Sequence, residues 1–378
     1  MAIAVGCQKK QTVPNERIIP NNAQAPVVRK LSPSEVLTEV SAALSVPGIP
    51  PPPLSKGTQK TARIQYLLTT EKALATLERL HETALGPRPA AANLLPPTRS
   101  EEIKRIGSAL AVALAYAVES KDSKKALAIV RTTERYIQFV AEESINGYIE
   151  SGAVYDLISQ GLQSLGTGAD PSIANALASV WTKSEGDGSL AASAIEAERV
   201  RIRSWSLLRQ KNARDSTVAE VVNSLSENSG TRTAGNEALR KLITQFAKEK
   251  GNRPMISATV LAEEAKIAAD SAIQILDPTA ESSPTLDSKK HPIATVFLSR
   301  LRKCLIAASD LTTIRGESLR LVSLSAKLLI GPLPESLKPF GENAISPVTG
   351  TTFLYKRNGE QFDLLRPTKP VKGTTSPK

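Results

Sequence analysis

Apolar residues recur at intervals of three and four along most of this chain, and that spacing constrains the fold more than any other feature. It is clearest over residues 100–119, where one side of a helix would carry Ile103, Ile106, Leu110, Leu114 and Ala117. The apolar residues are mainly Ala, Leu, Ile and Val, and aromatic residues make up only 4% of the chain. Because Ala and Leu favour helices, we predict a mostly α-helical fold.

Turn-forming residues separate the apolar stretches and predict helical hairpins. The short polar turn at 120–123, in which Asp122 or Ser123 can cap the next helix, indicates an antiparallel pair. Further helices are expected at 58–85, 151–165, 171–183, 189–210, 235–249, 257–275, 291–309 and 315–330. We therefore expect residues 58–330 to form stacked antiparallel helical hairpins, each of which buries its apolar side against its neighbours.

The two ends of the chain differ from this helical region. Residues 1–31 are polar and rich in Pro, Asn and Gln, which predicts a disordered N-terminal tether. Residues 32–57 predict a short helix followed by a Pro-rich spacer. A small C-terminal β-hairpin cap is expected at 331–366, and a disordered basic tail at 367–378.

The C-terminal cap is predicted from an Asn-Gly pair between two runs of alternating apolar residues. Such a pair favours a two-residue type I′ turn, because both central residues of that turn need a positive φ. With Asn358 and Gly359 in the turn, Arg357 would lie opposite Glu360, Tyr355 opposite Phe362, and Phe353 opposite Leu364. The hairpin would then cover the end of the predicted helix 315–330.

Groups for the common catalytic and metal sites are scarce. The chain has two histidines, His81 and His291, and two cysteines, Cys7 and Cys304. A metal site built from His or Cys needs more ligands than these, and neither histidine lies in a motif of nucleophilic catalysis. We therefore predict no metal, no cofactor and no enzymatic activity; catalysis by carboxylates alone is the enzymatic alternative.

Two of these four residues are predicted to be structural. His81 follows Leu77 by four residues and so shares the apolar side of helix 58–85 with Ile64, Leu67, Leu74 and Ala84. Cys304 follows Leu301 by three residues on the buried side of helix 291–309, where it should behave as a small hydrophobic residue.

The chain is basic, with a net charge of +11 and an isoelectric point of about 9.6. A basic cluster is expected on the predicted helix 189–210 and just after it, formed by Arg199, Arg203, Arg209 and Lys211. We interpret it as a solvated helix face; the alternative is a nucleic-acid site, which would also need stacking aromatic residues. Trp205 is the aromatic residue nearby, and we predict that it lies in the core.

The N-terminal segment contains a candidate lipidation site. The sequence from Ala4 to Cys7 resembles a bacterial lipobox, in which small residues precede a cysteine that becomes acylated. Only six residues precede Cys7, fewer than a signal peptide has, so this hypothesis requires a start upstream of Met1. The alternative is a free cysteine in a cytoplasmic segment. A membrane-spanning helix is not expected, because no run of about 18 apolar residues occurs.

A pattern of small, proline and aromatic residues leads into the predicted hairpin: Pro334, Ser336, Leu337, Pro347, Thr349, Gly350, Phe353 and Tyr355. It resembles a recurring ending of uncharacterised bacterial envelope proteins, which in turn looks like the C-terminal part of type II secretion pseudopilins. The turn at 120–123 with Lys125-Ala126-Leu127 is similar to the tetratricopeptide-like hairpins of the same proteins. Ser346 stands where that family has Asp, which argues against the pseudopilin calcium site. The resemblance implies an address in the cell envelope.

These observations favour a non-enzymatic helical scaffold or protein-interaction module of the cell envelope. We expect a protein or peptide partner, and membrane attachment through an acylated Cys7. The alternative is a basic helical protein of the cytoplasm that binds nucleic acid, with an affinity that falls steeply as salt rises.

Overall fold

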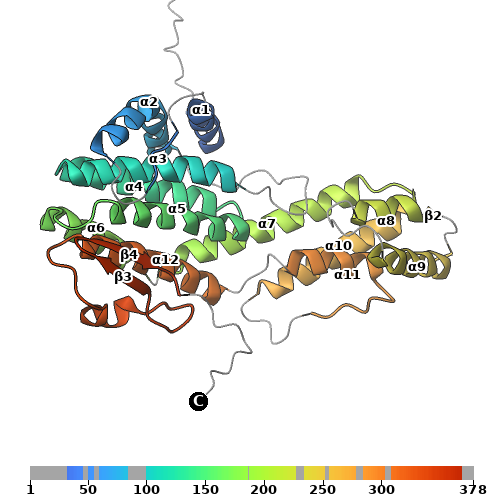
Figure 1. Cartoon of the computed structure of the whole chain (residues 1–378). Coiled ribbons are helices and arrows are strands. Elements are labelled where there is room, and N and C mark those ends of the chain that lie inside the picture. The colour runs from blue at the N-terminus through green and yellow to red at the C-terminus, as the bar shows by residue number, and fades with distance from the viewer. Residues whose placement is uncertain are drawn as a thin grey trace, which may run out of the picture.

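The fold is mostly α-helical with a small β-hairpin near the C-terminus, as predicted (Figure 1). The computed structural model describes residues 32–45, 50–54, 59–83, 99–185, 187–226, 234–251, 255–277, 284–302 and 308–367. Its α-helices are α1 Pro33–Ser45, α2 Lys60–Glu78, α3 Ser100–Glu119, α4 Ser123–Ala141, α5 Ile145–Gln163, α6 Pro171–Ser184, α7 Ser189–Lys211, α8 Val218–Ser226, α9 Ala234–Glu249, α10 Ala258–Ile275, α11 Pro292–Arg302 and α12 Ala308–Leu328. The short elements are η1 Arg79–Glu82, β1 Ser216–Thr217, β2 Met255–Ile256, η2 Lys338–Ala344, β3 Leu354–Asn358 and β4 Gln361–Leu365.

Helices α3 and α5 form the centre of the larger body of the molecule, and glycines bring them together. A Cβ added to Gly161 of α5 would lie 2.9 Å from the carbonyl oxygen of Ala111 in α3. A Cβ added to Gly107 of α3 would lie 2.7 Å from Cδ1 of Leu157 in α5. Each helix therefore uses a missing side chain to approach the backbone or side chains of the other, at the usual entropic cost of glycine in a helix.

Helix α12 closes this body by packing against α5 and α6, which precede it by more than a hundred residues (Figure 1). The contact includes two hydroxyl pairs: the buried Ser325 lies 2.7 Å from the buried Ser159, and the buried Ser323 lies 2.9 Å from the more exposed Thr182. Because each hydroxyl finds a partner, these polar side chains fit an otherwise apolar interface. The helical hairpins of the larger body are therefore joined by a contact between segments far apart in sequence.

Helix α7 leaves the larger body and reaches a second lobe that contains α8 to α11 (Figure 1). This lobe has its own apolar cluster, formed by Val221, Val222, Leu225, Ile243, Phe246, Ala247, Ile256 and Ile293. Phe297 of α11 packs against both this cluster and the main apolar cluster, which continues from the larger body along α7, α10 and α11. Its ring meets the Trp205 ring of α7 edge to face, with centroids 5.0 Å apart, so these two rings lie where the two apolar clusters meet.

Several helix boundaries agree with the prediction and others do not. Helix α3 spans 100–119 as predicted, and the carboxylate of Asp122 accepts a hydrogen bond from the Lys125 amide at the start of α4. The predicted boundary between helices 291–309 and 315–330 is wrong, because α12 begins at Ala308 and continues through Gly316. Packing on α5 and α6 outweighs the cost of about 1 kcal/mol for a glycine inside a helix.

Helix α8 is not among the predicted helices, although the sequence contains a signal for its start. Thr217 and Glu220 form a capping box: the Thr217 hydroxyl accepts from the Glu220 amide at 3.2 Å, and the Glu220 carboxylate accepts from the Thr217 amide at 2.8 Å. The spacing Thr-x-x-Glu before an apolar run is a recognised helix start. The predicted place of Cys304 lies outside the residues that the structure describes.

The C-terminal hairpin forms, but its predicted register is wrong. Tyr355 pairs with Leu364 rather than Phe362, and Arg357 pairs with Phe362. The two turn residues are Gly359 and Glu360, so the turn lies one residue later than predicted. Each pairing thus moves by two positions, which keeps every side chain on its predicted face. Of the two turn residues only Gly359 has a positive φ, 66°, which is the pattern of a type II′ turn.

Replacing Gly359 by valine is expected to lower the free energy of unfolding by about 1–2 kcal/mol, because a β-branched residue is strained at positive φ. No atom lies within 4 Å of a Cβ added there, so backbone strain is the sole cause. Gly359→Asn should cost less, since asparagine tolerates this region better than other non-glycine residues. Urea unfolding of the two variants measures the difference, and equal costs would contradict the assigned turn.

Candidate functional site

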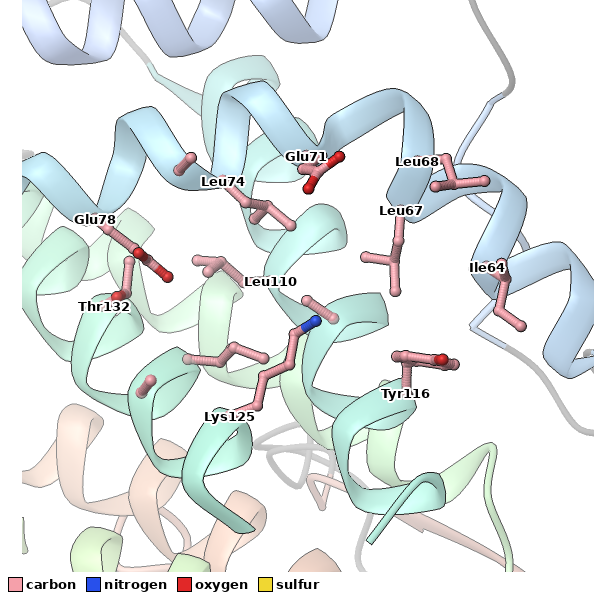
Figure 2. A pocket seen from close by; sticks show the side chains of 14 residues that line it. Ile64, Leu67, Leu68, Glu71, Leu74, Glu78, Leu110, Tyr116, Lys125 and Thr132 are labelled. Atoms are coloured by element: carbon pink, nitrogen blue, oxygen red, sulfur yellow. The ribbon is translucent and has the colours of Figure 1, made fainter. Parts of the chain in front are cut away.

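An apolar groove lies between α2 and α4, with α3 as its floor (Figure 2). We call it the α2–α4 groove, and its volume is about 330 Å³. It is lined by Ile64, Leu67, Leu68, Glu71, Leu74, Ala75, Glu78, Leu110, Ala113, Tyr116, Lys125, Ala128, Ile129 and Thr132. The volume lies at the lower end of the range for small-molecule sites, and the groove is open to solvent along α2.

The groove exists because α2 is apolar on two sides. One side is buried against the core through Tyr66, Ala73 and Leu77. Burial raises the pKa of Tyr66 to about 12, so its hydroxyl stays protonated at neutral pH. The other side carries Leu67, partly buried, and Leu68, whose side chain is 70% exposed. A helix that is apolar on both sides needs a second apolar surface to cover it.

The predicted apolar side of helix 58–85 is therefore only partly buried. Leu77 is buried, whereas Ile64, Leu67 and Leu74 are half-buried and line the groove; Leu67 and Leu74 also pack against the core cluster. Arg63 is buried on the side of α2 where an apolar side chain would be expected. Its guanidinium donates to the Glu119 carboxylate at 3.1 Å and to the Ser164 hydroxyl at 3.1 Å. Sequence periodicity did not indicate this charged core contact, because its partners come from elsewhere in the chain.

Small side chains in α3 and α4 leave room in the groove. Ala113 on the floor and Ala128 on the α4 wall face the space between the helices, beside the larger Leu110 and Ile129. Alanine keeps the helix stable while it occupies little volume. The Ala-rich composition that predicted the helices thus also produces an unfilled apolar space.

Charged residues border this apolar space on both walls. Glu71 and Glu78 are exposed and lie seven residues apart on α2, which is about 10.5 Å along the helix axis. From the α4 wall, the ammonium of Lys125 lies 5.9 Å from the centroid of the Tyr116 ring, in cation–π range. Figure 2 shows Glu78 and Lys125 reaching toward the groove from opposite walls. The arrangement suits recognition of an apolar group with polar flanks.

His81 does not share the buried side of α2. The α-helix ends at Glu78 and continues as the 3₁₀ turn η1, which turns His81 out to solvent. Its Nε2 atom lies 3.3 Å from the Thr132 hydroxyl of α4. The prediction that His81 lies on the apolar face of helix 58–85 is therefore wrong, and the reason is the change in helical pitch after Glu78.

The predicted basic cluster is spread around α7 and its C-terminal end. Arg199 donates a hydrogen bond to the Leu276 carbonyl at 2.8 Å and lies 3.4 Å from Glu196, so it ties α7 to the end of α10. Arg203, Arg209 and Lys211 are exposed. Arg209 and Lys211 point to different sides of the helix, since two residues turn it by about 200°. Trp205, predicted to be a core residue, is fully buried.

The residues of the C-terminal pattern hold that segment onto the larger body. The Tyr355 hydroxyl donates to the Pro334 carbonyl at 2.9 Å, which joins the two halves of the pattern. The buried Ser346 hydroxyl accepts from the amides of Val348 and Thr349, both at 3.2 Å, and donates to the Glu317 carboxylate. An aspartate at position 346 would place a second carboxylate against Glu317.

The remaining sequence-based candidates give no site in the described ranges. Cys7, the lipidation candidate, lies outside those ranges. Within them, no group of three or more His, Cys, Asp or Glu side chains is placed to hold a metal ion. Nor is any helix of the described part both long and apolar enough to cross a bilayer. Comparison with protein-family models, curated proteins and solved structures gives no match.

Proposed function

We propose that this protein is a helical interaction module that holds aliphatic side chains of a protein or peptide partner in the α2–α4 groove. The observation that carries the proposal is the exposed apolar side of α2, where Leu68 is 70% exposed above a groove lined by three helices. Exposed apolar surface beside a formed groove is typical of a docking site. The bordering charges of Glu71, Glu78 and Lys125 would orient the partner and favour some sequences over others.

The predicted basic cluster is spread around α7 in the described structure, which favours this function over nucleic-acid binding. In the described part of the chain, Arg199 is engaged with Leu276 and Glu196. Trp205, the aromatic residue beside the cluster, is buried and cannot stack on a base.

Peptides selected from a random displayed library on the full chain, then synthesised, test the proposal by fluorescence anisotropy. We expect Leu68→Asp and Ala75→Trp each to raise the Kd about tenfold or more, because the first adds a charge and the second fills the groove. The matched control is Leu207→Asp, since Leu207 is an exposed leucine, at 65%, on a different helix. Selected peptides that bind all three variants alike would refute the groove as the binding site.

We also propose attachment to the cell envelope through Cys7, on the lipobox-like sequence and the C-terminal resemblance. Labelled palmitate should enter the protein expressed from its native locus, and Cys7→Ser should abolish the label. Cys304→Ser is the control, because it removes the other cysteine of the chain and should keep the label. Unlabelled protein found wholly in the cytosol would contradict attachment.

A further inference from the structure

A second cavity, in the other lobe, combines an apolar floor with a cationic rim. It lies between α7, α8, α10 and α11 and has a volume of about 430 Å³; we call it the distal cavity. Apolar side chains from all four helices line it: Leu208, Val221, Leu225, Leu261, Ile293 and Phe297. Leu225 and Ile293 are almost fully buried, whereas Leu208 is 38% exposed at the mouth.

The rim of the distal cavity carries two arginines, Arg209 and Arg214, and the amide side chain of Asn212. Both arginines are exposed, and within the described ranges neither forms an ion pair, although the charge of Arg214 is one of the causes that lower the pKa of Glu220. Their guanidinium groups are therefore available to an anion, for which arginine offers several donors in a planar fork.

One carboxylate, Glu220, lines the cavity; Asp215 follows Arg214 in the sequence but does not line it, and each accepts a hydrogen bond at the start of a helix. Glu220 accepts from the Thr217 amide and hydroxyl, and these hydrogen bonds lower the pKa of Glu220. Asp215 accepts from the Ala258 amide at the start of α10, at 2.8 Å. Of the charged groups that line the cavity, two arginines thus face one glutamate, which leaves a net positive rim.

We propose that the distal cavity binds a single aliphatic chain that ends in an anionic head group. The chain would lie on the apolar floor, where burial of each methylene contributes about 0.8 kcal/mol. The head would lie at the rim and accept hydrogen bonds from Arg209, Arg214 and Asn212. This site is separate from the α2–α4 groove and does not depend on the function proposed for it.

The fluorescence of Trp205 can report binding in the distal cavity. Phe297 lines the cavity and meets the Trp205 ring edge to face at 5.0 Å, so a chain on the floor lies one ring away from Trp205. The protein contains only two tryptophans, and the Trp181→Phe variant keeps Trp205 as the sole one. A dodecanoate brominated near its end should quench the fluorescence of Trp205 in the full-length Trp181→Phe protein. Calorimetric titration of the unsubstituted protein with dodecanoate gives the same Kd without any substitution.

Variants that remove a rim charge, and ligands with the same chain length but different head groups, test the proposal. Arg209→Gln and Arg214→Gln should each raise the Kd for dodecanoate about tenfold, the effect of losing one charged hydrogen bond. Arg203→Gln is the control, because Arg203 is an exposed arginine of the same helix that does not line the cavity. Dodecyl phosphate should bind as well, and its Kd relative to that of dodecanoate identifies the preferred head group.

Three results would overturn the proposal. Equal affinity for dodecyltrimethylammonium would show that the arginines do not select an anion. Equal affinity for acetate would show that the apolar floor takes no part. Quenching by vesicles of brominated anionic lipid, without quenching by the dissolved monomer, would assign the surface to membrane contact rather than to a cavity ligand.

Discussion

Replacing Glu198 by alanine is expected to lower the free energy of unfolding by about 3–5 kcal/mol, the largest effect of any single charge removal that we foresee. The Glu198 and Arg201 side chains are 1% and 7% exposed, and the carboxylate accepts from the guanidinium of Arg201 through both of its oxygens. Removal of the carboxylate leaves the guanidinium buried without this counterion. Urea unfolding followed by circular dichroism measures the loss.

A second ion pair on the same helix is the matched control. Glu196 and Arg199 have the same spacing of three residues on α7, but the Glu196 side chain is 57% exposed. Glu196→Ala should therefore cost less than about 1 kcal/mol, as exposed pairs do. Replacement of Glu198 and Arg201 together by Leu and Met should recover most of the loss. A loss at Glu198 no larger than the loss at Glu196 would contradict the burial of the inner pair.

Replacing Trp205 by alanine is expected to cost about 3–5 kcal/mol, because the cavity left by a buried indole among packed helices collapses only in part. Trp205 is fully buried and contacts Phe297, which packs against both apolar clusters. We expect the variant to loosen the packing of α11 against α7 as well as to lower overall stability. Thermal unfolding and limited proteolysis would follow the two effects separately.

Trp205→Phe separates the ring from its polar atom. The indole nitrogen is buried and has no hydrogen-bond partner among the described residues, so a phenyl ring removes no hydrogen bond. The cost should stay below about 1.5 kcal/mol, as for other exchanges between large apolar side chains. If Trp205→Phe proves as harmful as Trp205→Ala, a polar contact of the indole rather than its volume would be responsible.

The sequence was sufficient where the structure depends on neighbours along the chain. Helix α3 follows from its apolar spacing, and α4 starts at Asp122 because that side chain caps its own helix. Helix α8 could also have been predicted, since its capping box is local. The faces of the C-terminal hairpin followed from alternation, which survives a shift of the pairing by two positions.

The register of that hairpin depends on contacts that the local sequence does not contain. The Gln163 side chain at the end of α5 clamps β4: it donates to the Leu364 carbonyl at 3.1 Å and accepts from the Leu364 amide at 2.9 Å. The turn itself is held by the Thr167 amide, which donates to the Glu360 carbonyl at 2.9 Å. These contacts fix β4 against the larger body, and the turn adopts the type II′ pattern instead of the expected type I′.

The candidate sites also depend partly on local sequence and partly on contacts between distant segments. Periodicity identified α2 as a helix and placed Ile64, Leu67 and Leu74 on its apolar side, but it could not show that this side lines a groove shared with α3 and α4. It grouped Arg199 with Arg209, whereas contacts with α10 engage the first and the distal cavity places the second at its rim. A cavity is formed by helices that meet from distant parts of the chain, so no local pattern predicts it.

What the sequence by itself determined is the helical character of the chain, most helix positions and the faces of the hairpin, because each depends on interactions within a few residues. The tertiary structure alone decided the closure by α12, the hairpin register, the two cavities and the burial of charge. Glu196 with Arg199 and Glu198 with Arg201 are equivalent pairs in the sequence. Only one of them is buried, because α7 rotates that side toward its neighbours, and burial sets the energy of an ion pair.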